Sequence, residues 1–185
     1  MKQFIYGLLL FVFLTLPPVA TLLESIMIIH MHLQMPLLIF SGFLMARFFK
    51  VRFPAFFYKW NRNGIPGILL FSIILVYWMI PRTMDEALTV YASEIFKFIS
   101  LPFLAGIPLR DSWRKLGSVS KNIVFLIFII LFILMGWLFI GVDDQICNNY
   151  LRVDQITLGW GYVTLAACMI IYIVQLIFGD QSEFE

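Results

Sequence analysis

The sequence has few charged residues. Asp, Glu, Lys and Arg make up 13% of its 185 residues, whereas ordinary soluble domains contain about 25%. Hydrophobic residues account for 62% of the chain, among them 20 Phe, and the mean hydropathy is +0.94. This composition excludes a water-soluble monomer, and a net charge of +2 does not indicate a nucleic-acid partner. We therefore expect an integral membrane protein in contact with lipid.

The chain also has few residues that carry catalytic or redox chemistry. Its two cysteines, Cys147 and Cys168, are too few for a disulfide framework. Its two histidines, His30 and His32, make a haem held between facing helices hard to build. The sequence contains no Walker loop, HExxH motif, GxSxG motif or His pair at i, i+4 spacing. We predict that the protein is not an enzyme.

Long apolar runs make up most of the sequence. A membrane-spanning helix needs about 20 mainly apolar residues, so the chain has room for about six spans and for no separate soluble domain. The sequence predicts an all-α, polytopic transmembrane helical bundle that forms a single domain over residues 1–185. The predicted spans cover residues 4–23, 26–45, 66–80, 87–109, 123–142 and 154–178.

The first predicted span contains Pro17 and Pro18, which loosen or end a helix. We expect the first two spans to form a tight hairpin that turns near residues 21–25. Lys2, the apolar run and the sequence Pro-Val-Ala at 18–20 also resemble a secretory signal. Because proline suits the cleavage site poorly, we interpret the segment as a retained first span.

Basic residues concentrate in alternate loops, and this predicts the orientation of the chain, because cytoplasmic loops carry the excess of Lys and Arg. Two basic residues, Arg82 and Arg152, lie in the other loops, and Lys97 lies within a span. We expect both termini in the cytoplasm, an acidic outer face, and a location in the bacterial inner membrane. The remaining ten basic residues are Lys2, Arg47, Lys50, Arg52, Lys59, Arg62, Arg110, Arg114, Lys115 and Lys121.

The predicted loop over residues 47–64 alternates basic residues with Phe, Tyr and Trp. This composition suits the headgroup region of a membrane, where aromatic rings and long basic side chains both find partners. We interpret the loop as an interfacial anchor. Binding of an anionic lipid or of a partner subunit is the alternative.

The segment from Met27 to Met35, near the expected outer end of the second span, is rich in candidate metal ligands. At 100° per residue, His30 and His32 lie about 200° apart on a helix, so they cannot bind one ion as simple helix neighbours. Thioether and imidazole groups together favour copper, especially Cu(I). The alternative is that Met fills gaps in the core and each His forms one interhelical hydrogen bond. The candidate ligands are His30, His32, Met31 and Met35, with Glu24 and Asp154 completing or orienting the site.

Other polar residues in or near the spans have structural explanations. Glu94 and Lys97, three residues apart in the fourth predicted span, are expected to form a buried ion pair, with a metal second shell or a proton path as the alternative. Asp154 is expected to cap the sixth span at its N-terminus. The outer loop over 143–155 contains carboxylates and one thiol but no His, which indicates a metal only weakly.

Three stretches, taken in order, resemble motifs of the CtaG-like family of membrane proteins. These are His30–Met35 followed by Pro36-Leu37-Leu38; Asp85–Leu88 leading through Glu94 and Lys97 to Ala105-Gly106 and Trp113; and Asp154-Gln155 with Leu158-Gly159. Members of that family are assembly factors for caa-type cytochrome c oxidase, to which copper handling is ascribed. The resemblance implies a related helical bundle that presents copper on its outer face.

The leading hypothesis is therefore a membrane protein that assists the assembly or copper loading of a copper-containing respiratory or oxygenase complex, with that complex's subunits as partners. The alternative is a non-catalytic accessory subunit of such a complex that has lost metal binding. A small transporter that uses Glu94 and Lys97 is a third hypothesis, but no inverted repeat or Gly-broken pair of spans supports it.

Overall fold

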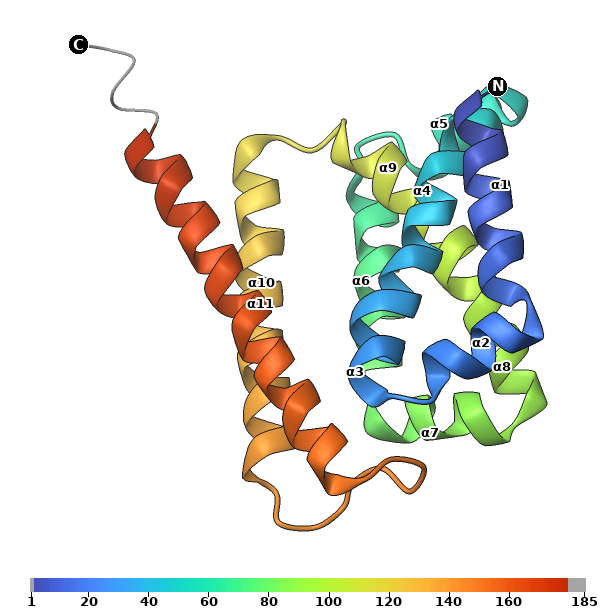
Figure 1. Ribbon diagram of the computed structural model, residues 1–185. Coiled ribbons are helices and arrows are strands. Elements are labelled where there is room, and N and C mark those ends of the chain that lie inside the picture. Colours follow the sequence, from blue (N-terminus) through green and yellow to red (C-terminus); the bar gives the residue numbers. More distant parts are fainter. Residues whose placement is uncertain (1, 180–185) are drawn as a thin grey trace. The chain divides into compact units, whose positions relative to one another are not determined.

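The computed structural model describes residues 2–179, and these are almost entirely helical (Figure 1). The all-helical prediction is confirmed. Two segments, η1 and η2, are π-helical turns inside longer helices. The elements are α1 (Lys2–Thr15), α2 (Pro17–Glu24), α3 (Met27–Ile29), η1 (His30–Gln34), α4 (Met35–Arg52), α5 (Pro54–Trp60), α6 (Ile65–Met79), α7 (Pro81–Thr89), α8 (Tyr91–Ile99), η2 (Ser100–Gly106), α9 (Ile107–Trp113), α10 (Ser118–Gly141) and α11 (Arg152–Gly179).

The described helices provide four to six candidate membrane spans by length and composition. Four are continuous, over Met27–Arg52, Tyr91–Trp113, Ser118–Gly141 and Arg152–Leu176. Two more are bent pairs, α1 with α2 at 71° and α5 with α6 at 86°. The protein is thus a multi-pass helical membrane protein.

Three of the breaks between helices lie immediately before a proline, at Leu16, Phe53 and Ile80. The first span bends at Leu16, immediately before Pro17, as the Pro-Pro pair predicts. The fourth predicted span, 87–109, is wrong at its start, because the helix breaks at Val90 and α7 is a separate helix that begins at Pro81. The predicted loop over 47–64 is also largely helical. There α4 continues to Arg52, and α5 begins at Pro54, since proline fits the first turn of a helix.

The described chain divides into two compact units. The first comprises residues 2–116 together with 147–150, and the second comprises 117–146 and 151–179.

In the first unit, α4 packs against α1, η2 and α9, and α6 packs against η2 and α9. Two glycines let the central backbones meet. A Cβ on Gly42 would lie 1.9 Å from the carbonyl oxygen of Pro102, and a Cβ on Gly106 would lie 2.1 Å from that of Ile39. Small residues at such crossings replace side-chain packing with close backbone contact, as in many membrane helix pairs.

The second unit is the pair α10 and α11. A Cβ on Gly136 would lie 3.1 Å from the carbonyl oxygen of Gly159, so the two helices meet there at close range. Phe139 is buried beside the crossing and stacks on Tyr162 at a ring-centre distance of 6.0 Å. Only 22% of the most apolar window of each helix is buried, so most of the apolar surface of this pair is available for contact with lipid.

Candidate functional site

A buried ion pair lies at the end of the first unit that contains α2 and α7 (Figure 1). Lys97 on α8 has a fully buried side chain, and its ammonium group pairs with the carboxylate of Glu24, the last residue of α2. An ammonium group within a membrane-spanning segment is costly unless an opposite charge neutralises it. The pair therefore holds the end of α2 against α8, although the two residues lie 73 positions apart.

Two further side chains bind Glu24. The Nε2 of Gln34, in η1, donates to the Glu24 carboxylate at 3.1 Å. The hydroxyl of Tyr150 donates to the main-chain oxygen of Glu24 at 2.7 Å. Glu24 thus joins α2, η1, α8 and the short segment 147–150 in one buried polar network. The network consists of Glu24, His30, Gln34, Lys97 and Tyr150, and it is called the Glu24 network below.

The hydrogen bonds define the tautomer of His30. Its Nδ1 lies 2.9 Å from the hydroxyl oxygen of Tyr150. Since that hydroxyl donates its only proton to Glu24, it must accept from His30, so Nδ1 carries the hydrogen and Nε2 carries a lone pair. The Nε2 atom is buried and has no hydrogen-bond partner among the residues that the structure describes. A buried polar atom without a partner calls for an explanation.

The structure brings some of the predicted metal ligands near one another and separates others. His30, Met31 and Met35 are buried on the η1 and α4 segment, and His32 is half-buried. Glu24 joins them through Gln34 and Tyr150, but its carboxylate is already bound by Lys97. Among residues 2–179, no group of three or more His, Cys, Asp or Glu residues is arranged to hold a metal ion.

Asp154 lies in the second unit and has a structural contact of its own. Because α11 begins at Arg152, its N-cap is Leu151 and Asp154 is the third residue of the helix, so the predicted N-cap position is wrong by three residues. Its carboxylate accepts the backbone N–H of Leu151 at 3.3 Å. This is the reach-back half of a capping box, which stabilises the start of a helix.

The predicted ion pair between Glu94 and Lys97 is wrong. Lys97 pairs with Glu24, whereas Glu94 is half-buried and forms no ion pair within the described part of the chain. Helical spacing correctly puts Glu94 and Lys97 on one side of α8. The fully buried ammonium group instead takes a carboxylate that enters from another helix, so Glu94 need not be desolvated as well.

The segment 147–150 is attached to the first unit by Asp85 on α7. The Asp85 carboxylate accepts the backbone N–H of Asn148 at 2.7 Å and the side-chain amide of Asn149 at 3.3 Å. Cys147 is fully buried beside them. Burial, with a smaller contribution from the Asp85 charge, raises the pKa of the Cys147 thiol to about 12. This thiol is therefore protonated at neutral pH and suits neither metal binding nor nucleophilic chemistry.

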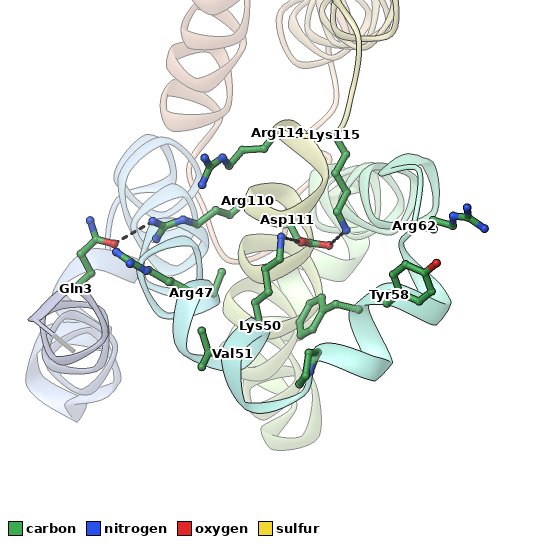
Figure 2. Close-up of a pocket in the computed structure, with 13 residues that line it drawn as sticks. Gln3, Arg47, Lys50, Val51, Tyr58, Arg62, Arg110, Asp111, Arg114 and Lys115 are labelled. Carbon is green, nitrogen blue, oxygen red and sulfur yellow. Dashed lines mark hydrogen bonds and ion pairs between the residues drawn. The ribbon is translucent and has the colours of Figure 1, made fainter.

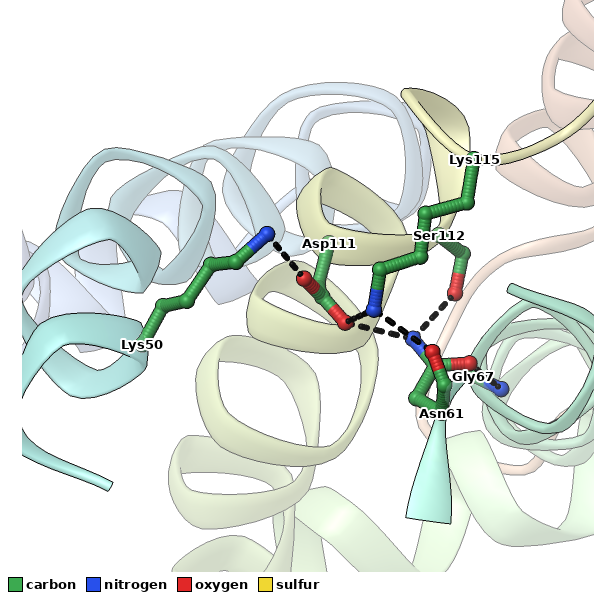
Figure 3. A network of polar contacts seen from close by, with 6 residues as sticks. All are labelled: Lys50, Asn61, Gly67, Asp111, Ser112 and Lys115. Carbon is green, nitrogen blue, oxygen red and sulfur yellow. Dashed lines mark hydrogen bonds and ion pairs between the residues drawn. The ribbon is translucent and has the colours of Figure 1, made fainter. Parts of the chain in front are cut away.

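A second polar cluster lies at the opposite end of the first unit, around Asp111 on α9 (Figure 3). Lys50 and Lys115 approach its carboxylate from two sides, at 2.9 Å and 2.5 Å. Asn61 donates to the same carboxylate at 2.7 Å and accepts the backbone N–H of Gly67 at 3.0 Å. The cluster therefore ties α4, α6 and α9 together beside a cavity lined by many basic residues (Figure 2).

Sequence reasoning missed Tyr150 and Asp111. Tyr150 lies in the predicted outer loop, whose carboxylates and thiol indicate a metal only weakly, and Asp111 is one acid within a basic stretch that indicates orientation. The one available signal for Asp111 is that it lies four residues before Lys115, a spacing that favours an ion pair.

Comparisons of the chain with protein-family models, with curated proteins and with solved structures find no match. The resemblance to the CtaG-like family stays a prediction.

The Tyr150→Phe variant tests the Glu24 network. Loss of the hydroxyl leaves the Nδ1–H of His30 and the main-chain oxygen of Glu24 without their partner, which costs about 1–3 kcal/mol for a buried group. Unfolding of the detergent-solubilised chain by added SDS measures the loss. Tyr91→Phe is the matched control, because Tyr91 is 76% exposed, and it should change the free energy of unfolding by no more than about 0.5 kcal/mol. Equal effects of the two variants would contradict the network.

Thiol labelling tests the burial of Cys147. At pH 8 the raised pKa lowers its thiolate fraction about a thousandfold relative to an ordinary thiol. We expect a maleimide to label Cys147 slowly in the folded Cys168→Ser variant and fast once SDS is added. A cysteine introduced as Asp144→Cys, at an exposed site in the same loop, is the control in a chain that lacks both native cysteines. Similar rates for the two thiols in the folded chain would show that Cys147 is accessible.

Proposed function

We propose that this protein is a non-catalytic accessory subunit of a larger complex in the bacterial inner membrane, and that it acts through packing and binding. The observation that carries the proposal is the Glu24 network. Its charged groups neutralise one another, and its hydrogen bonds join four separate parts of the first unit. A network of this kind fixes helix packing and specifies one arrangement of the chain.

The surface of the second unit is consistent with binding to a partner subunit. Since α10 and α11 bury only 22% of their most apolar windows, most of their surface is left for lipid or for helices of other subunits. Membrane helices associate through close packing at small residues, but Gly136 and Gly159 are already used within the pair. A partner helix would therefore pack on the larger aliphatic and aromatic side chains that cover the rest of both helices.

Copper handling is the second candidate function, and the free Nε2 atom of His30 favours it. Histidines that bind metals usually donate their other ring N–H to a neighbouring group, which fixes the tautomer, as Tyr150 does here. Met27, Met31 and Met35 are buried in the same stretch of chain, and thioethers suit Cu(I). Copper would be held by His30 together with these methionines, as the resemblance to the CtaG-like assembly factors implies.

The position of Lys97 places this candidate second. Its ammonium group lies in the same network as His30 and acts on that imidazole as a positive charge, so it opposes a bound cation. Glu24, which would offset that cation, already neutralises Lys97. The residues present thus offer one free imidazole nitrogen in soft surroundings, but no carboxylate that is available to the metal.

Two substitutions of His30 separate the two functions. His30→Asn keeps an amide donor near the position of Nδ1 and so can retain the bond to Tyr150, whereas it removes Nε2. His30→Gln instead places its amide near the position of Nε2 and leaves the Tyr150 hydroxyl without its donor. The wild type and both variants are purified in a mild detergent. Co-purifying proteins are identified by mass spectrometry, and copper is measured by elemental analysis of the same samples.

The accessory function predicts that the wild type and His30→Asn retain the same membrane partners in the same ratio, with no copper above that of a mock purification. It also predicts that His30→Gln loses stability and partner. Stoichiometric copper in the wild type that disappears in His30→Asn would support copper handling. A chain that purifies without any membrane partner would contradict the accessory function.

A further inference from the structure

A cavity of about 840 Å³ lies in the first unit, at the end opposite the Glu24 network (Figure 2). Its walls come from α1, α4, α5, α9 and the residues that follow α5 and α9. Six of its lining residues are basic and one, Asp111, is acidic. The basic lining residues are Arg47, Lys50, Arg62, Arg110, Arg114 and Lys115.

The single carboxylate leaves most of this positive charge without a partner. Asp111 is bound by Lys50 and Lys115, as described above. Arg62 lies against the ring of Tyr58, with its guanidinium carbon 5.6 Å from the ring centre, and it points away from the other basic groups in Figure 2. Three guanidinium groups remain, those of Arg47, Arg110 and Arg114.

Arg110 is held in place without being neutralised. Its guanidinium donates to the main-chain oxygens of Phe43 and Leu44 at 2.8 and 3.3 Å and to the Oε1 of Gln3 at 3.0 Å. These acceptors carry no net charge, so they fix the position of the guanidinium and leave its positive charge available to a ligand.

Arg47 and Arg114 lie on either side of Arg110 in Figure 2, and both charges act unfavourably on it. Neither forms a hydrogen bond or an ion pair within the described part of the chain. Three like charges gathered at one cavity repel one another, and a bound anion would remove this repulsion. Guanidinium groups match the geometry of a phosphate, to which they donate paired hydrogen bonds.

The other wall of the cavity is apolar and lies where a membrane surface is expected. Val51, Pro54 and Phe57 line it. Helix α5 is bent by 86° from α6, so it runs along the membrane plane if α6 crosses the membrane. The exposed aromatic residues of this region suit the headgroup layer; they are Phe53, Phe56, Tyr58 and Trp60.

We propose that this cavity binds the phosphate of an anionic phospholipid, with Arg47, Arg110 and Arg114 as donors and the apolar wall against the start of the acyl chains. Basic pockets at the cytoplasmic ends of membrane helices bind such headgroups, and the excess of basic residues at this end predicts that it faces the cytoplasm. A soluble phosphate would gain nothing from Val51, Pro54 and Phe57, which favours a lipid as the source of the phosphate. This assignment does not depend on the proposed accessory function.

The test compares two pairs of substitutions that remove the same charge. The pocket pair is Arg47→Gln with Arg114→Gln. The control pair is Arg52→Gln with Lys59→Gln, on α4 and α5, where both side chains are exposed and neither lines the cavity. Delipidated full-length chain in detergent is titrated with phosphatidylglycerol, phosphatidylcholine or inorganic phosphate, and bound molecules are counted by native mass spectrometry.

We expect phosphatidylglycerol to bind the wild type and to bind the pocket pair about a hundredfold more weakly, because each lost charged hydrogen bond weakens binding about tenfold or more. The control pair should keep the wild-type affinity within about threefold, since exposed charges contribute little. Phosphatidylcholine should bind all three chains equally weakly. Inorganic phosphate should show no binding at the concentrations at which phosphatidylglycerol binds the wild type.

Equal losses in the two pairs would overturn the proposal in favour of diffuse surface attraction. Inorganic phosphate that binds the wild type as tightly as the lipid, with the same dependence on the pocket pair, would overturn the assignment to a lipid. The pair Arg47→Lys with Arg114→Lys guards against misfolding, because it keeps the charge and loses the paired geometry. That chain should bind phosphatidylglycerol with an affinity between those of the wild type and the glutamine pair, and wild-type affinity in it would overturn the guanidinium assignment.

Discussion

The ion pair between Glu24 and Lys97 is the interaction on which the arrangement of the first unit depends. The side chain of Lys97 is fully buried in a membrane-spanning segment, so its positive charge must be neutralised by an acidic group inside the protein. The carboxylate that meets this condition comes from the end of α2, 73 residues earlier. The bend before Pro17 gives α2 its own direction, and the π-helical turn η1 places His30 and Gln34 on the buried side. Tyr150 then secures a segment from much later in the chain to the same carboxylate residue.

The two ends of the first unit differ in their charge balance, and this difference separates their roles. In the Glu24 network every charge has an opposite partner within the protein, so the network stabilises packing. At the Asp111 end the arginines outnumber the acids, and Arg110 is fixed by uncharged acceptors. An excess of fixed positive charge beside an apolar wall can bind an anion that carries an apolar tail, whereas a network without net charge has no such attraction for an anion. One end thus holds the bundle together, and the other is suited to contact its surroundings.

Much of the fold follows from the sequence, because long apolar runs and proline act locally. The spans predicted over 123–142 and 154–178 correspond to α10 and α11, which begin five and two residues earlier, and the bend at Leu16 follows from the Pro-Pro pair. The hydrogen-bond and ion-pair partners of the polar groups could not be predicted from the sequence. Helical spacing relates Lys97 only to neighbours such as Glu94, and no pattern along the chain indicates that Glu24 takes its place. Asp154 is not the N-cap of α11, because the helix begins at Arg152, two residues before the predicted start at Asp154. The role of Asp111 could not be predicted, because the distribution of basic residues indicates orientation but does not indicate which acid they bind.

A double-mutant cycle on the Glu24 and Lys97 pair tests this account most directly. The free energy of unfolding in SDS is measured for Glu24→Gln, for Lys97→Met and for the two together, all in the full chain. Each single change leaves a buried charge or a buried polar group unmatched, so each should cost about 3–5 kcal/mol. The double variant should cost much less than their sum, with an interaction energy of about 3 kcal/mol. If the two losses simply add, the pair does not hold the first unit together, and the account is contradicted.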